Sequence, residues 1–253
     1  MANSLSRTVQ AFDLLAAFPR GLTVTDLAEK MSANKSTVSR LLASLVEDGL
    51  VERDETGRHF LDVRFWTWGV QAARRLPFLD IARPHMEAAV KECANASYIA
   101  VVRGDQTIYL ESLTPQDDYA MYNILSYIVP VYACAPGKAI LAFSSEDVRE
   151  SVLNGPLKQF TPNTFATRET LSAELGRIRQ QGYAINRGEY YDNNHLAVAA
   201  PILDYEPKPV ASVCFYGISD EARLEKLIPS LLQLSDVISS SLGYRRGVRE
   251  LVG

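Results

Sequence analysis

The sequence TVTDLAEKMSANKSTVSRLLASLVEDG, residues 23–49, decides the fold of the first part of the chain. Its second half places apolar residues at i, i+3, i+4, i+7 and i+8, a spacing that predicts a helix from residue 34 with one buried stripe, formed by Val38, Leu41, Leu42, Leu45 and Val46. The opposite face of the first turns carries short hydroxyls and two cations, Lys35, Ser36, Thr37, Ser39 and Arg40. Such side chains suit phosphate oxygens and base edges in a major groove.

Two further helices are expected ahead of this one. Thr23 and Asp26 have the spacing of a capping box, which predicts a short helix over residues 24–31 that buries Val24, Leu27, Ala28 and Met31. The tight link at residues 32–34 then gives the layout of a helix-turn-helix. A covering helix is expected over residues 4–18, with Leu5, Val9, Phe12, Leu15 and Ala16 on its inner face.

A β-hairpin is expected after the third helix. Gly49 is suited to a left-handed C-cap, and residues 50–53 and 58–61 have strand character around a turn at residues 54–57. Such a wing would offer Arg53 and Arg58 to a phosphate backbone or minor groove. Each piece alone has an ordinary explanation as a solvated helix face or a cap. The ordered set predicts DNA binding.

Residues 5–61 resemble the DNA-binding half of IclR-type bacterial transcriptional regulators. The run KSTVSRLL at residues 35–42 matches the recognition helix of that family, and Arg7 stands where the family commonly has arginine. The resemblance continues through residues 136–139 (PGKA), 182–185 (GYAI) and 198–201 (VAAP), so it covers nearly the whole chain. The predicted DNA contacts are Arg7, Thr25, Lys35, Ser36, Thr37, Ser39, Arg40, Arg53 and Arg58.

Length and composition indicate which class of protein this is. The chain has 253 residues, 47% apolar and 22% charged, which is typical of a globular protein with room for two domains. No apolar run approaches the ~20 residues that span a bilayer, and residues 1–20 lack a signal-peptide pattern, so a cytoplasmic protein without membrane contact is expected. Three scattered cysteines show neither a disulfide framework nor a metal spacing, and no cofactor or metal is expected.

The charge balance argues only weakly for DNA. Residues 1–75 hold 10 Lys and Arg against 9 Asp and Glu, and the remainder holds 16 against 21. Affinity that does not depend on sequence should therefore be modest, and specific binding should depend on a few placed cations that a dimer doubles.

We expect three segments. Residues 1–62 form a winged helix-turn-helix domain, mainly α with a small β wing, and residues 63–76 form a linker helix. Residues 77–253 form an α+β effector-binding and oligomerisation domain, similar to the GAF-like domain of the family. The linker is rich in aromatic residues, Phe65, Trp66 and Trp68, so it either packs on its own domain or contacts a partner subunit. We favour the partner subunit, because the linker of the related family helps to make the dimer, and that family commonly forms dimers of dimers. Asp62 stands where the family usually has glycine after the wing, so the sequence does not predict the path of the chain as it leaves the second wing strand.

In the second domain, helices are expected over residues 78–94, 137–143, 145–153 and 168–181 and in an amphipathic C-terminal segment. Strands are expected over residues 97–103, 107–113, 119–124, 129–133, 195–203 and 208–217. Their order favours one largely antiparallel sheet with helices on its faces.

The effector site is expected where loops meet the strand ends. Pro136 and Gly137 open a helix whose free N–H groups suit a carboxylate, and the resemblance places Ala135, Pro136 and Gly137 in the small-molecule pocket. An ordinary helix start with Lys138 in solvent is the equal alternative. The resemblance also places an acid, Glu189, in this pocket, together with Asp192 and Ala197. The alignment of residues 192–197 with the family pattern is ambiguous by one residue, because this sequence has one extra residue there. Abundant tyrosines in this domain favour an aromatic carboxylate.

These observations predict a sequence-specific regulator that binds a palindromic operator in double-stranded DNA and is modulated by a small organic acid. Two alternatives stay open. A metabolite-processing enzyme would use Cys134 with His195 and Asp192 or Glu189, although no sequence context activates that thiol. A DNA-binding dimer that needs no ligand would show no ligand-dependent rise in melting temperature.

Overall fold

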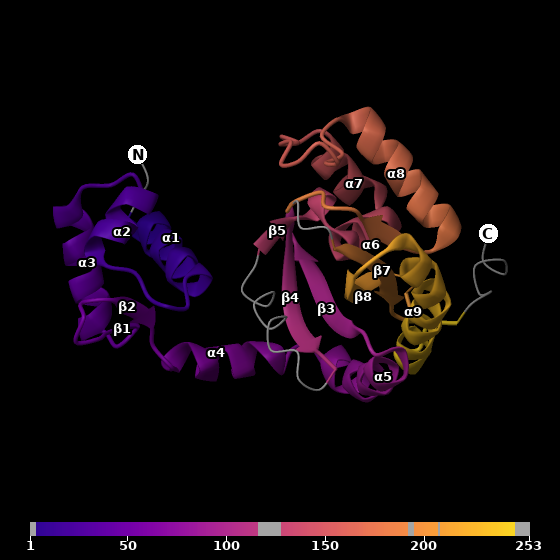
Figure 1. Ribbon diagram of the computed structural model, residues 1–253, viewed down its shortest axis with the longest axis horizontal. Helices are drawn as coiled ribbons and strands as arrows, with labels where there is room; N and C mark the ends of the chain where they lie inside the picture. The colour runs from indigo at the N-terminus through magenta and orange to yellow at the C-terminus, as the bar shows by residue number, and fades with distance from the viewer. Residues whose placement is uncertain (1–3, 116–127, 192–194, 207, 246–253) are drawn as a thin grey trace. The chain divides into compact units, whose positions relative to one another are not determined.

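The computed structural model describes residues 4–115, 128–191, 195–206 and 208–245 (Figure 1). The chain divides into two compact units, residues 1–77 and residues 78–253. The predicted strand over residues 119–124 and the predicted site residue Asp192 lie outside the described residues.

The first unit is a three-helix fold with a two-stranded wing, followed by one further helix. Its elements are α1 (Ser4–Ala17), α2 (Val24–Lys30), α3 (Lys35–Glu47), β1 (Val51–Arg53), β2 (His59–Leu61) and α4 (Arg64–Ala73). The core contains ten buried apolar side chains: Ala11, Leu15, Leu22, Leu27, Ala28, Met31, Val38, Leu42, Leu45 and Val51.

Local hydrogen bonds fix the ends of these helices as the sequence predicts. The Thr23 amide donates to Asp26 Oδ2 (2.9 Å) and the Asp26 amide donates to Thr23 Oγ1 (3.2 Å), which completes the capping box. Gly49 has φ +66° after α3, and the Leu50 amide returns to the Leu45 carbonyl (2.8 Å). A residue with a side chain is strained at that φ, so glycine is favoured there.

Part of the predicted core was wrong. Leu5 and Val9 of α1 are 70% and 49% exposed, whereas Leu15 is buried as predicted and Ala11, which was not predicted, is buried with it. Val9 precedes Ala11 by two residues, roughly 200° around a helix, so the two cannot share a face. Val46 at the end of α3 is also exposed.

The second unit contains a six-stranded antiparallel sheet in the order β5-β4-β3-β8-β7-β6. The strands are β3 (Ala96–Arg103), β4 (Gln106–Leu113), β5 (Ile128–Pro130), β6 (Ala184–Asn186), β7 (Leu196–Leu203) and β8 (Pro209–Ile218). Residues 129–133 were predicted as strand, but the chain leaves the sheet after Pro130 into a 3₁₀ turn, η2 (Val131–Ala133), where the Val131 amide donates to the Asp105 carbonyl.

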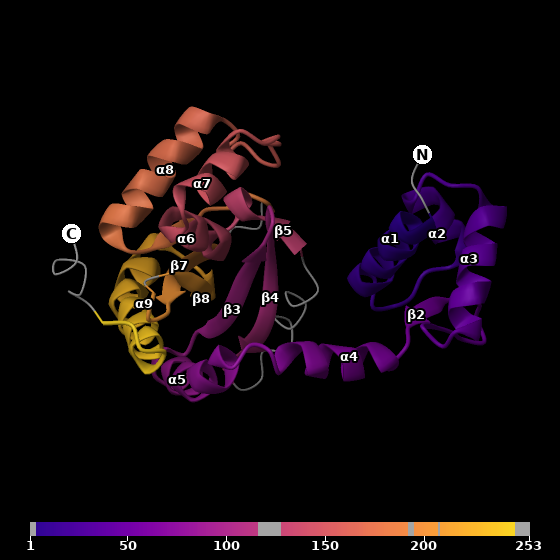
Figure 2. The same cartoon turned by 180° about the vertical axis from the view of Figure 1, so that it is seen from behind.

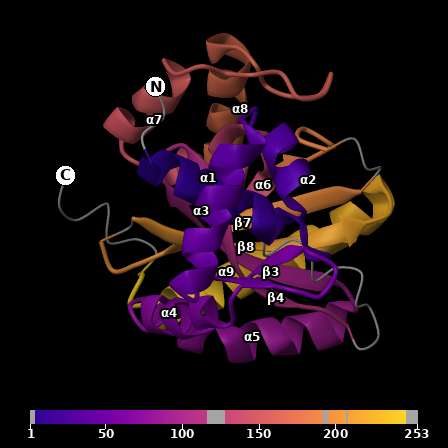
Figure 3. The same ribbon diagram turned by 90° about the vertical axis from the view of Figure 1, so that its left-hand side faces the viewer.

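Helices cover both faces of this sheet (Figures 1, 2 and 3). Helix α6 (Ala135–Phe143) packs on β3, β7 and β8, with α7 (Glu146–Leu153) and α8 (Arg168–Gln181) outside it. Helices α5 (Phe78–Cys93) and α9 (Glu221–Ser241) pack together against the other side. Nearly every residue of α6 is buried, so this helix lies at the centre of the second unit.

Candidate functional site

The start of α3 presents the polar surface that the sequence predicts. Lys35, Ser36, Ser39 and Arg40 are exposed and Thr37 is half-buried, while the opposite face of the helix is buried. The N-cap residue Asn34 makes no side-chain hydrogen bond to the first turn. The first N–H groups of α3 therefore lack a capping side chain, and they point with the positive end of the helix dipole toward any phosphate placed there.

The other predicted DNA contacts are spread over three elements of the same unit. Arg7 on α1, Thr25 on α2 and Arg53 on β1 are exposed, and none of the cations Arg7, Lys35, Arg40 and Arg53 has an ion pair among the described residues. Arg58 differs, because its Nη1 donates to the Gly21 carbonyl (3.0 Å) and lies 4.0 Å from Asp26 Oδ2. The Arg58 side chain therefore connects the wing to the loop before α2, and it is also partly exposed to solvent.

Helix α4 has one packed side and one open side. Phe65 meets Phe12 of α1 edge to face, with ring centroids 4.9 Å apart. Trp68, 52% exposed, meets the Phe65 ring edge to face at 5.4 Å. On the open side, Val63, Trp66 and Val70 are exposed, Trp66 by 75%. Apolar surface of this kind on one short helix is typical of a protein contact.

The predicted effector segment opens α6 and is buried. Cys134 is the N-cap, and Ala135, Pro136 and Gly137 form the first turn. A Cβ on Gly137 would lie 2.4 Å from both the Val131 carbonyl oxygen and Thr107 Oγ1. Glycine is therefore required here by the close approach of α6 to η2 and β4, whatever else this turn binds.

Lys138 corrects the expectation of a solvent-exposed lysine. Its side chain is fully buried, and Nζ donates to Glu174 Oε1 (3.1 Å), to Glu189 Oε1 (2.6 Å) and to the Ile185 carbonyl (2.9 Å). Nζ also lies 4.5 Å from the centre of the Phe165 ring. All three ammonium hydrogens have acceptors, which a buried cation requires. The signal was present in the sequence, because the residues around Lys138 in 135–143 are all apolar or glycine.

Glu174 and Glu189 have different surroundings. Glu174 Oε2 pairs with the exposed Arg177 at 2.6 Å. Glu189 Oε2 is buried and has no hydrogen-bond partner among the described residues. Burial raises the pKa of Glu189 to about 7, because loss of hydration outweighs the attraction of the Lys138 ammonium group.

The backbone around Glu189 is held by its neighbours. Its amide donates to Asn186 Oδ1 (3.1 Å), its carbonyl accepts from the Thr164 hydroxyl (2.6 Å), and Asn186 Nδ2 donates to the Ala133 carbonyl (3.2 Å). Glu189 and the start of α6 are therefore fixed to each other through Asn186.

Ala197 lies on β7, buried and paired with Tyr216 of β8, and Leu196 is half-buried at the start of the strand. In the same core cluster as Ala197, the ring of Tyr98 packs edge to face on the rings of Tyr109 and Tyr216, with ring centroids 6.3 Å and 5.8 Å apart. Cys134 and Cys214 belong to the same core cluster. Ala197 and the start of α6 thus border one tyrosine-rich core.

Cys134, the nucleophile of the enzyme alternative, is not activated by its surroundings in the described part of the chain. The Cys134 thiol is buried, donates to Thr107 Oγ1 (3.4 Å) and lies 3.9 Å from the Pro130 carbonyl, and burial raises its pKa. A protonated thiol is a poor nucleophile. Within the described residues, no cluster of His, Cys, Asp and Glu could hold a metal ion, and no helix is long and apolar enough to cross a membrane.

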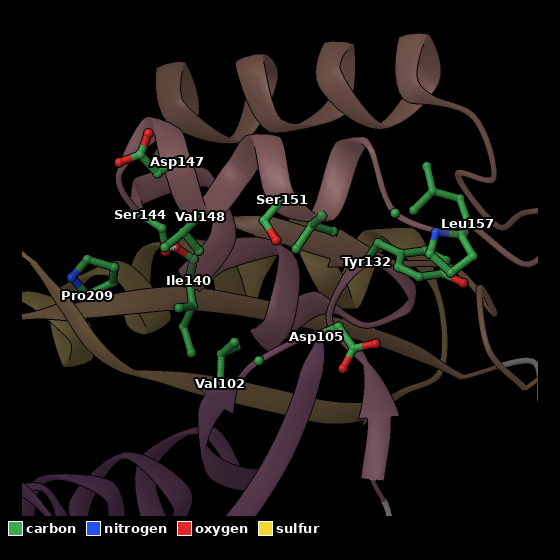
Figure 4. Close-up of a pocket in the computed structure, with 14 residues that line it drawn as sticks. Val102, Asp105, Tyr132, Ile140, Ser144, Asp147, Val148, Ser151, Leu157 and Pro209 are labelled. Carbon is green, nitrogen blue, oxygen red and sulfur yellow. Dashed lines mark hydrogen bonds between the residues drawn. The ribbon is translucent and has the colours of Figure 1, made fainter. Parts of the chain in front are cut away.

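A cavity of about 680 Å³ lies beside α6 (Figure 4). It is lined by Ile140 of α6, the α6 C-cap Ser144, Ser151 of α7, Val102 of β3 and Tyr132 of η2. None of the predicted effector residues borders this cavity.

Comparison with known proteins assigns the family. Residues 4–55 match the IclR helix-turn-helix domain, and residues 70–240 match the C-terminal domain of bacterial transcriptional regulators of the IclR type. The chain belongs to the IclR family. It is a transcriptional regulator with a DNA-binding helix-turn-helix and an IclR effector domain, and its relatives are named as regulators rather than enzymes.

Relatives match along almost their whole length. The regulator XynR of Escherichia coli is 26% identical, with 95% of this chain and 97% of that protein aligned, and KipR of Bacillus subtilis is 28% identical, with 96% and 100% aligned. Among solved structures, IclR of Thermotoga maritima has a TM-score of 0.71 at 28% identity, covering 96% of this chain and 99% of that one. An IclR homologue from Microbacterium hydrocarbonoxydans, complexed with 4-hydroxybenzoate, has a TM-score of 0.75 at 25% identity, covering 95% and 99%. These matches confirm the winged helix-turn-helix and α+β effector domains that the sequence predicts.

Proposed function

We propose that this IclR-type regulator binds a palindromic operator as a homodimer or dimer of dimers and that a small organic acid, of the aromatic carboxylate class, changes its affinity for that operator. The site of action is the cytoplasm, where the operator DNA lies. The observation that carries the DNA part is the exposed polar start of α3, where Asn34 makes no side-chain cap and Lys35 and Arg40 form no ion pair with any residue that the structure describes.

DNA contacts are assigned by position on the first unit. Lys35, Ser36, Thr37, Ser39 and Arg40 enter the major groove, while Arg53 and Arg58 of the wing, with Arg7 and Thr25, contact the backbone. Residues 4–55 match the IclR helix-turn-helix domain, which supports this docking.

Selection of operators from a random DNA pool tests the proposal, followed by titration of the selected site at several salt concentrations. Arg40→Ala should lower specific affinity about 5- to 150-fold, the effect of losing one good base or phosphate contact of ~1–3 kcal/mol. Lys91→Ala is the matched control, since it removes an exposed cation from α5 in the second unit. Equal affinity of wild type and Arg40→Ala would remove Arg40 from the interface.

The dimer contact is assigned to the open side of α4. Val63, Trp66 and Val70 have the i, i+3, i+7 spacing of one helix face and are all exposed, and burying Trp66 with them against a second copy would contribute several kcal/mol. Trp66→Glu should weaken self-association in sedimentation equilibrium. An unchanged association constant would move the dimer contact elsewhere.

The effector is assigned to the start of α6 and the residues beside it. Ala135, Pro136, Gly137, Glu189, Asp192 and Ala197 are the proposed contacts. The homologue bound to 4-hydroxybenzoate, which shares this fold at 25% identity, supports an aromatic acid, and the tyrosines around Tyr98 provide ring surfaces for one. Thermal unfolding with 4-hydroxybenzoate and a panel of aliphatic acids tests this, because a ligand of the native state must raise the melting temperature. A protein that no acid stabilises, but that still selects an operator, would be the ligand-independent alternative.

A further inference from the structure

The starting point is an unsatisfied atom in the second unit. Glu189 Oε1 accepts from Lys138 Nζ at 2.6 Å, while Oε2 is buried without a hydrogen-bond partner among the described residues. Buried polar atoms in native proteins almost always have a partner, and an exception calls for a reason. A bound molecule that completes the site would supply one.

The position of Glu189 links it to the proposed effector site. Its Oε1 accepts from Nζ of Lys138, the fourth residue of α6, at 2.6 Å. Asn186 joins the backbone of Glu189 to Ala133, one residue before that cap. An acid seated at the first turn of α6 would therefore lie beside Glu189.

The charged side chains around Glu189 do not provide a free cation for another anion. Lys138 from α6 faces two carboxylates, Glu174 from α8 and Glu189 itself, and the second cation of the cluster, Arg177, is exposed and pairs with Glu174. Arg187 near Glu189 is paired with Glu221. The cluster is neutral when both glutamates are ionised, and an effector carboxylate would make it negative.

We propose that Glu189 takes up a proton when the effector binds and donates it as a hydrogen bond from Oε2 to the effector carboxylate. The inference rests on the proposed effector site. The proton comes from solvent, so the ionised protein, the effector anion and one proton form a complex in which Glu189 is a neutral carboxylic acid. Two carboxylates that share a buried site bind one proton between them for the same reason. The raised pKa of Glu189, about 7, makes this uptake accessible near neutral pH.

The test is calorimetric titration of the full-length protein with 4-hydroxybenzoate and the acids of the panel, in buffers with different ionisation enthalpies. We expect an uptake approaching one proton per acid bound above pH 7, and an affinity that falls up to tenfold per pH unit there. Glu189→Gln keeps an oxygen for Lys138 and an N–H donor for the ligand. It should bind the acid with little proton uptake and a flat pH profile.

Glu111→Gln is the matched control, since Glu111 is a partly buried glutamate with a raised pKa on β4, paired with Arg83. It should behave as wild type. Infrared difference spectra between wild type and Glu189→Gln, each with the acid bound, should show the carbonyl band of one protonated carboxylic acid. Binding without proton uptake, or equal uptake in Glu189→Gln, would overturn the inference and leave the proposed function standing. Failure of every acid to bind would refute the proposed effector site, and the inference with it.

Discussion

Replacing Lys138 by methionine is the most demanding test of the buried charge cluster. The side chain keeps a similar length and apolar stem but loses the ammonium group that contacts Glu174, Glu189 and the Ile185 carbonyl. Two buried carboxylates then lose their shared cation. Breaking a buried ion pair in this way costs about 3–5 kcal/mol. That is a large part of the ~5–15 kcal/mol by which a typical protein is stable.

The two units can be followed separately. Both tryptophans of the chain, Trp66 and Trp68, lie on α4 in the first unit. Tryptophan emission during urea unfolding, measured at one fixed protein concentration because α4 is also the proposed dimer contact, therefore reports the first unit and its self-association, while far-UV circular dichroism reports both units. Lys138→Met should shift the circular dichroism transition to lower urea and leave the emission transition near its wild-type position.

Two variants separate the charge effect from loss of packing. Arg177→Met removes the exposed partner of Glu174 and should cost no more than about 1 kcal/mol, as exposed pairs do. Adding Glu174→Gln and Glu189→Gln to Lys138→Met removes the uncompensated charges and should recover most of the loss. If Lys138→Met lowers the free energy of unfolding by no more than Arg177→Met does, the buried ion pairs of Lys138 do not stabilise the fold.

Three further predictions follow from single residues. Because the folded state raises the pKa of Glu189 from 4.5 to about 7, the free energy of unfolding should fall by about 3 kcal/mol as pH rises from ~4.5 to ~7, and a urea series in Glu189→Gln should show that this fall is gone. Gly137→Ala places a Cβ 2.4 Å from the Val131 carbonyl and should lower stability by about 1–3 kcal/mol, whereas Gly176→Ala on α8 meets nothing within 4 Å and should raise it by ~0.5–1 kcal/mol in the same unfolding assay. Thr23→Ala removes the hydroxyl that accepts from the Asp26 amide, leaves the backbone half of the capping box in place, and should cost about 1 kcal/mol, read from tryptophan emission; no change would mean that α2 does not depend on this side-chain cap.

The first unit could be predicted in detail because its signals are local. The capping box, the left-handed Gly49 and the stripe through Val38, Leu42 and Leu45 each depend on residues a few positions apart. The predicted burial of Leu5 was wrong because α1 has apolar residues on two sides. Either side could be the buried face, and only packing against the neighbouring helices decides which one is.

The second unit could be predicted only in outline. Its strands and helices have local patterns, but the order of the sheet and the partners of Lys138 join segments far apart in the chain. Glu174 lies 36 positions from Lys138 and Glu189 lies 51 positions from it, and no spacing rule connects them. The burial of Lys138 could have been inferred from its apolar neighbours; the identity of its acceptors could not.

The central pairing of the sheet has a consequence for how the protein is made. Residues 96–100 of β3 pair with residues 212–216 of β8, so the middle of the sheet closes only after β8 has left the ribosome. The helices and wing of the first unit need only contacts within residues 4–73 and can be complete much earlier. Long-range pairing of this kind folds slowly and leaves strand edges open meanwhile. During synthesis, a finished DNA-binding unit should therefore exist for some time beside an unfinished effector unit, and variants that slow the closure of β3 on β8 should aggregate through the second unit while the first still folds.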